Sequence, residues 1–149
     1  MISIAQEKRE EILEILKREQ ESKIPDYLKS SLAHYICILI SSYLENSLRQ
    51  IILDYAERKC SDQSIYKFVN SSLGRIRNPN CKNIKDLLKR FDFVIKLENR
   101  QRETIESIYT NRNGIAHSES PKDLSLSRVK EYFEIICTVV DAIDQRFNI

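Results

Sequence analysis

The run Leu-Ala-His-Tyr-Ile-Cys-Ile-Leu-Ile at residues 32–40 lies in the middle of a long segment without glycine or proline. Because almost every position in it is apolar, a helix built from this run is apolar nearly all round, as a buried helix is. Further along the segment, the apolar residues narrow to one face. We expect one helix from about Asp26 to Lys59, and we place it at the centre of a helical bundle.

Shorter amphipathic segments flank this central helix. Residues 4–22 predict a charged helix with a narrow apolar stripe, which Pro25 separates from the central helix. Asn78-Pro79-Asn80 is the clearest turn in the chain. The remaining expected helices are one capped by Ser61 or Asp62 that ends near Gly74, one capped by Asn83 that reaches Phe91, one from about Arg100 towards residue 112, and a last one that begins at a capping box, Ser120-Pro121-Lys122-Asp123.

The composition fits a helical bundle better than a β-rich protein. Two glycines and three prolines in 149 residues, with 31% charged residues, leave little turn chemistry for hairpins. The length is that of one domain able to bury a core. We therefore expect an all-α fold, a compact bundle of about five to six helices, as a single domain over residues 1–149. An alternative treats residues 1–23 as an N-terminal helical extension.

The positive charge of the chain is concentrated in one segment. The net charge is only +2, but residues 75–102 hold nine Lys or Arg residues and three Asp or Glu residues. Such a segment is either a solvated helix face or a surface that follows a phosphate backbone. In the second interpretation the RNA-binding residues are Lys82, Lys85, Lys89 and Arg90.

The cysteines and the apolar runs indicate a cytoplasmic protein. Cys37 and Cys137 lie among apolar residues, where reduced, buried thiols are expected. The spacing of the four cysteines and two histidines offers no local zinc site, so we expect no metal and no other cofactor. The N-terminus lacks the apolar stretch of a signal peptide, and no run is long enough to span a bilayer, so no membrane partner is expected.

The chemistry of the chain is concentrated at residues 112–117, Arg-Asn-Gly-Ile-Ala-His. Histidine exchanges protons near neutral pH, and arginine presents a planar, charged fork that matches phosphate oxygens. His117 can deprotonate a ribose 2′-hydroxyl or protonate the leaving oxygen, while Arg112 stabilises charge on the phosphorus. His34 has no arginine before it at this spacing, and we interpret it as a core or rim histidine.

This string resembles the Arg-Asn-x-x-x-His signature of HEPN domains, an all-helical family found in many prokaryotic RNase toxins and defence proteins. The residues of this string are most similar to those of the RiboL-PSP-type HEPN branch. The resemblance implies an endoribonuclease whose two protomers pair so that their motifs line one composite cleft. Some HEPN proteins extend the motif to His-x-Tyr, but Ser118 and Glu119 follow His117 here. That departure argues against a partner transferase and leaves RNase activity open.

Helix geometry leaves two ways for the motif to work. Five residues at about 100° each place Arg112 and His117 roughly 140° apart on a continuous helix, whereas Asn113 and His117 share a face. Either the backbone bends at Asn113-Gly114, or the two residues act across a dimer interface. A purely structural interpretation is also open, in which Arg112 bonds the last carbonyls of its helix and His117 is a satisfied polar group.

Glu45 is a second candidate on the central helix, within a polar stripe that includes Ser41, Ser42, Asn46 and Arg49. Tyr43-Leu44-Glu45 looks like the "LE" element of RiboL-PSP-type HEPN sequences, in which the acid is thought to face the Arg/His cleft. The alternative is an ion pair with Arg49, four residues on.

The residues and the resemblance together predict a metal-independent endoribonuclease, in which Arg112, His117, Asn113 and Glu45 form the catalytic set. Its expected partners are RNA, a second copy in a homodimer, and a cognate antitoxin or regulatory protein. A toxin or phage-defence role follows from the resemblance. The alternative function is a non-catalytic HEPN module that binds a protein or a nucleotide.

Overall fold

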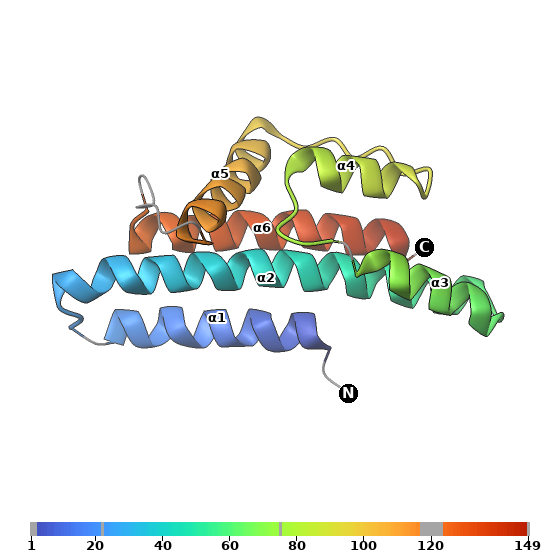
Figure 1. The fold of residues 1–149 in the computed structure, drawn as a ribbon. Coiled ribbons are helices and arrows are strands. Elements are labelled where there is room, and N and C mark those ends of the chain that lie inside the picture. The colour runs from blue at the N-terminus through green and yellow to red at the C-terminus, as the bar shows by residue number, and fades with distance from the viewer. Residues whose placement is uncertain (1–2, 22, 75, 117–123, 149) are drawn as a thin grey trace.

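The chain forms a bundle of α-helices. The computed structural model describes residues 3–21, 23–74, 76–116 and 124–148, and within these ranges it contains helices and no strands. The all-α prediction, with about five to six helices, is confirmed. The six helices in these ranges are α1 (Ile4–Glu21), α2 (Asp26–Lys59), α3 (Gln63–Leu73), α4 (Cys81–Lys89), α5 (Asn99–Ala116) and α6 (Leu126–Phe147) (Figure 1).

Helix α2 is the centre of the bundle. Helices α1 and α6 run alongside it, α5 crosses it, and α4 packs against α5 (Figure 1). The apolar run of residues 32–40 supplies Ile36 and Ile40, both fully buried, and Ile12 of α1 belongs to the same core. Within the described ranges, no helix combines the length and the apolar character that crossing a membrane requires.

The boundaries of α2 and α3 follow the predicted signals. Pro25 has an extended ψ of 142° just before α2, and Cys60 returns to an extended conformation just after Lys59. Asp62 caps α3 by accepting a hydrogen bond from the Ser64 amide at 2.9 Å, and Gly74 follows its last residue. The sequence therefore located both ends of the 34-residue central helix.

Two predicted helix starts are wrong. The N-cap of α4 is Asn80, whose side chain accepts a hydrogen bond from the amide of Asn83 at 2.8 Å, so Asn83 is the third helical residue and not the cap. The last helix begins at Leu126, where Ser125 accepts from the amide of Arg128. Residues 120–123, the predicted capping box, lie outside the described residues, and Leu124 and Ser125 are not helical.

An aromatic cluster closes the bundle near the end of α6. Tyr55, Phe91 and Phe93 surround Phe147 with ring centroids 5.2–6.0 Å away, in edge-to-face geometry. Arg58 donates to the carbonyl oxygen of Phe147 at 2.7 Å. These contacts fix the segment that follows α4 to the ends of α2 and α6.

Candidate active site

The motif residues Arg112 and Asn113 lie near the C-terminal end of α5, a helix that packs on α2. Helix α5 continues through Asn113 and Gly114 to Ala116, and no described glycine has a positive φ. Of the two alternatives for the motif, the continuous helix therefore argues against a bend at Asn113-Gly114. His117 lies outside the described residues.

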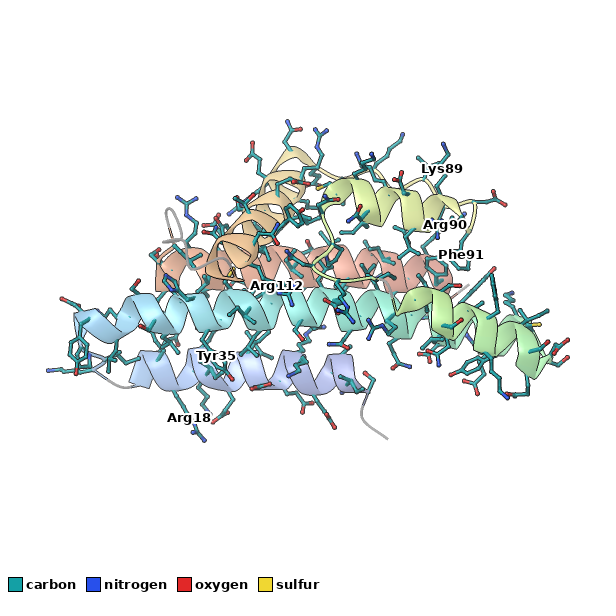
Figure 2. All side chains as sticks on the ribbon, viewed as in Figure 1. Arg18, Tyr35, Lys89, Arg90, Phe91 and Arg112 are labelled. Atoms are coloured by element: carbon teal, nitrogen blue, oxygen red, sulfur yellow. The ribbon has the colours of Figure 1, made fainter. Side chains whose placement is uncertain are left out.

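Arg112 is half-buried where α5 meets α2 (Figure 2). Burial raises the pKa of the Cys37 thiol on α2 to about 12, and the positive charge of Arg112 acts in the opposite direction. Arg112 makes no ion pair or side-chain hydrogen bond with any residue that the structure describes. The described hydrogen bonds therefore do not support the interpretation in which Arg112 bonds the last carbonyls of its helix.

Asn113 is held by Asn78, a residue of the connection between α3 and α4. The Asn78 side-chain amide donates to Asn113 Oδ1 at 2.9 Å and to the Tyr109 carbonyl at 3.4 Å. Its own oxygen, Oδ1, accepts from the hydroxyl of Ser41 on α2 at 3.1 Å. One side chain thus joins the motif helix to the central helix.

The backbone of Asn78 is unusual in the same place. Its φ is 42°, in the left-handed region, where asparagine is tolerated better than most residues. The backbone amide of Asn78 donates to Glu45 Oε2 at 3.1 Å. The left-handed turn and the buried side chain therefore place the backbone amide and both polar side-chain atoms of Asn78 against α2 and α5.

Glu45 has one predicted partner and one that was not predicted. Its Oε1 lies 3.6 Å from Arg49 Nη2, so the predicted i, i+4 pair with Arg49 is present. Its other oxygen accepts from Asn78, which in turn bonds the motif residue Asn113. Glu45 reaches the motif through Asn78, and it has no direct contact with Arg112 among the described side chains.

The polar stripe on α2 is covered by the connection that contains Asn78. Ser41 is almost fully buried beneath Asn78, and Arg49 Nη2 donates to the carbonyl of Ile76 at 3.3 Å. Asn46 bonds the carbonyl of Ser42 within α2 at 2.8 Å. The stripe thus anchors the segment that approaches α5.

The predicted RNA-binding residues lie together on α4 and just after it. Lys82, Lys85 and Lys89 are all exposed, and their spacing of three and four residues places them on one helix face. Arg90, the C-cap of α4, is exposed as well (Figure 2). None of the four forms an ion pair with a carboxylate in the described part of the chain.

Asn78 is the functional candidate that sequence reasoning missed. Asn78-Pro79-Asn80 predicted a turn, but nothing in a single sequence indicates which helices a turn residue will contact. Ser41 lies 37 positions before Asn78, and Asn113 lies 35 positions after it. The polar stripe on α2 is the signal that could have indicated Asn78. Polar groups on a packed helix require partners, and here these come from elsewhere in the chain.

The described residues offer chemistry for holding an anion. A half-buried arginine that has no carboxylate partner among the described residues can hold a phosphate, and an anchored asparagine next to it fixes the local backbone. No group of three or more His, Cys, Asp or Glu side chains within the described ranges is arranged to hold a metal ion.

Comparison with known proteins identifies one family. The family model described as RiboL-PSP-HEPN matches residues 4–148, which include all six helices. No curated protein and no solved structure gives a significant match.

Proposed function

Because this chain belongs to the RiboL-PSP-HEPN family, we propose that it is an endoribonuclease that cleaves RNA without a metal ion. Arg112 and His117 carry out the reaction, and Asn113 positions them. A role as a toxin or a defence effector, regulated by a cognate antitoxin or other protein, is part of the proposal, since HEPN domains occur in many such proteins.

The proposed reaction is a transesterification. The ribose 2′-oxygen attacks the adjacent phosphorus, so that the O2′–P bond forms as the P–O5′ bond breaks, leaving a 2′,3′-cyclic phosphate and a free 5′-hydroxyl. His117 either takes the proton from the 2′-hydroxyl or gives one to the leaving 5′-oxygen, and water exchanges the other proton. Arg112 binds the phosphate oxygens and stabilises the charge that grows on them.

The observation that carries the proposal is the hydrogen bond between Asn78 and Asn113. It ties the motif helix to α2 beside Arg112, whose guanidinium has no carboxylate partner among the described residues. A fixed backbone, and a cation that forms no ion pair in the described part of the chain, suit the preorganised stabilisation of a phosphate.

A homodimer would complete the site. On a helix that continues past Gly114, residues 112 and 117 are expected roughly 140° apart, a poor arrangement for contacting one phosphate. Two protomers whose motifs face each other avoid this difficulty, because Arg112 of one copy and the histidine of the other then line a single cleft. This is the arrangement that we propose.

The decisive experiment compares the wild type with His117→Ala for cleavage of total cellular RNA in excess EDTA. His34→Ala is the matched control, because it removes the only other histidine, half-buried on α2 beside Ser30. We expect wild type and His34→Ala to cleave and to leave cyclic phosphates, and His117→Ala to lose at least about 100-fold in rate. Equal cleavage by wild type and His117→Ala would overturn the assignment. A folded wild type that never cleaves would favour the non-catalytic binding module.

A further inference from the structure

A groove separates α3 from α4 on the surface of the bundle. It has a volume of about 670 Å³ and opens between Phe68 of α3 and Asn83 of α4. Ile76, Arg77 and Pro79, from the connection between α3 and α4, also line it. This volume falls in the range of pockets that hold small organic ligands, and it is large enough for one nucleotide.

The floor and one side of the groove are apolar. Leu48 and Ile84, which are almost fully buried, line it, and Pro79 and Leu87 add to this surface. Phe68 lines the groove with 71% of its surface exposed. An aromatic ring held on a helix next to an apolar floor is a platform on which a nucleobase can stack.

The rim of the groove is positively charged. Arg77 and Arg90 both line it, and neither forms an ion pair within the parts of the chain that the structure describes. Asp86, also in the lining, supplies a carboxylate that can accept hydrogen bonds from the amino and imino groups of a base. Lys82, Lys85 and Lys89 belong to the same helix, although none of them lines the groove.

We propose that this groove binds one unstacked nucleotide of a single-stranded RNA, with its base on Phe68 and its phosphates at Arg77 and Arg90. The inference deepens the proposed function, since it names a substrate subsite outside the Arg112–His117 cleft. A duplex cannot use the groove in this way, because its bases are already stacked and paired.

The groove and the motif share one short segment. Arg77 and Pro79 line the groove, whereas Asn78 between them faces α2 and α5. Consecutive Cα atoms are about 3.8 Å apart, so the groove wall begins one residue from the side chain that holds Asn113. RNA bound in the groove therefore contacts the same short segment that holds the motif helix.

The test measures binding of a fluorescently labelled single-stranded RNA by anisotropy, in a His117→Ala background so that the RNA stays intact. We expect Phe68→Ala to weaken binding by roughly 5- to 100-fold, and Phe68→Tyr, which keeps the ring, to bind normally. Tyr27→Ala is the matched control, because Tyr27 is 77% exposed at the start of α2, away from the groove lining. It should bind like the parent.

The phosphate contacts of Arg77 and Arg90 are tested by the salt dependence of single-stranded RNA binding. Each phosphate contact on a single strand contributes about 0.7 to the slope of log K against log salt, so Arg77→Ala with Arg90→Ala should reduce the slope by about 1.4. Arg18→Ala, which removes an exposed arginine paired with Glu14 on α1, should leave the slope nearly unchanged. A double-stranded RNA of the same sequence should be insensitive to Phe68→Ala.

Three results would overturn the proposal. The first is a parent protein that binds no single-stranded RNA. The second is normal affinity and salt slope in Phe68→Ala and in the double arginine variant. The third is a Phe68→Ala protein with unchanged RNA binding but a changed mass by light scattering, which would assign the ring to a protein contact. Since binding is read without catalysis, failure of the nuclease proposal alone leaves these readouts intact.

Discussion

Asn78 Nδ2 lies 2.9 Å from Asn113 Oδ1, and this hydrogen bond joins the connection between α3 and α4 to the motif helix. The same asparagine holds Ser41 and Glu45 of α2. Substitutions that remove any of these hydrogen bonds are therefore expected to affect both stability and the placement of Arg112.

Two substitutions of Asn78 separate the stability that its side-chain hydrogen bonds contribute from the stability that depends on its left-handed backbone. Asn78→Ala loses the side-chain bonds and forces an alanine into a left-handed φ, so we expect the free energy of unfolding to fall by about 2–4 kcal/mol. Asn78→Gly loses the same bonds but adopts this φ readily, and should cost about 1 kcal/mol less. Urea unfolding measures both values. Equal losses in the two variants would show that the left-handed turn contributes nothing.

Substitutions at Asn113 distinguish stability from activity. Asn113→Asp keeps an oxygen that accepts from Asn78, so its free energy of unfolding should stay close to that of the wild type, whereas Asn113→Ala should lose about 1 kcal/mol. The aspartate places a negative charge beside Arg112, where it competes with the phosphate. We therefore expect Asn113→Asp to cleave RNA at least about tenfold more slowly. If Asn113→Asp is stable and cleaves RNA at the wild-type rate, Arg112 is not the residue that binds the phosphate.

Two substitutions of Glu45 test whether its carboxylate transfers a proton or only positions Asn78. Glu45→Gln keeps an oxygen that accepts from the Asn78 amide, while Glu45→Ala leaves that partly buried amide without its partner, at a cost of about 1–3 kcal/mol. We expect Glu45→Gln to cleave RNA with the pH profile of the wild type, because Glu45 reaches the motif only through Asn78 in the described structure. A displaced limb of the pH–rate profile in Glu45→Gln would instead assign proton transfer to this carboxylate.

The buried thiols predict a loss of stability at high pH. Burial raises the pKa of Cys37 from 9.0 to about 12, so the folded state holds this proton over a range in which the unfolded state loses it. The stabilisation is complete below pH 9 and is lost as the pH rises towards 12. We expect the free energy of unfolding to fall over this range, by up to about 1.4 kcal/mol per pH unit for one thiol.

Cys37→Ala should make this decline shallower without abolishing it, because burial also raises the pKa of Tyr43 to about 12. Cys60→Ala is the control, since Cys60 is only half-buried at the end of α2. Urea unfolding at several pH values between 8 and 11 gives the slopes. Identical slopes in the wild type and Cys37→Ala would contradict the assignment.

The sequence predicted the elements that depend on local signals. The apolar run at residues 32–40, with Pro25 before it, indicated both the place and the extent of α2. Asp62 and Gly74 delimited α3 for the same reason, since each is a boundary residue by its own chemistry. The Arg-Asn-x-x-x-His string then indicated the family.

The elements that depend on tertiary contacts were not predictable in this way. Asn80 and Asn83 are both good N-cap residues, and the choice between them depends on how Cys81 and Ile84 are buried. The continuation of α5 through Asn113-Gly114 contradicts a strong local turn signal. The side chain of Asn113 is bonded to Asn78, and this contact with a distant part of the chain is invisible in the motif itself.

The lysines of α4 provide a test of the electrostatic part of RNA binding. Lys85 and Lys89 are exposed and, within the described structure, without carboxylate partners, so replacing both with alanine should leave the free energy of unfolding within about 0.5 kcal/mol of the wild type. Two lost phosphate contacts should lower the salt slope for single-stranded RNA by about 1.4. Lys17→Ala with Lys23→Ala removes the same charge from exposed positions in and just after α1, and should change the slope little. If both double variants lower the slope equally, net charge and not the face of α4 determines RNA affinity, and the basic segment is a solvated helix surface.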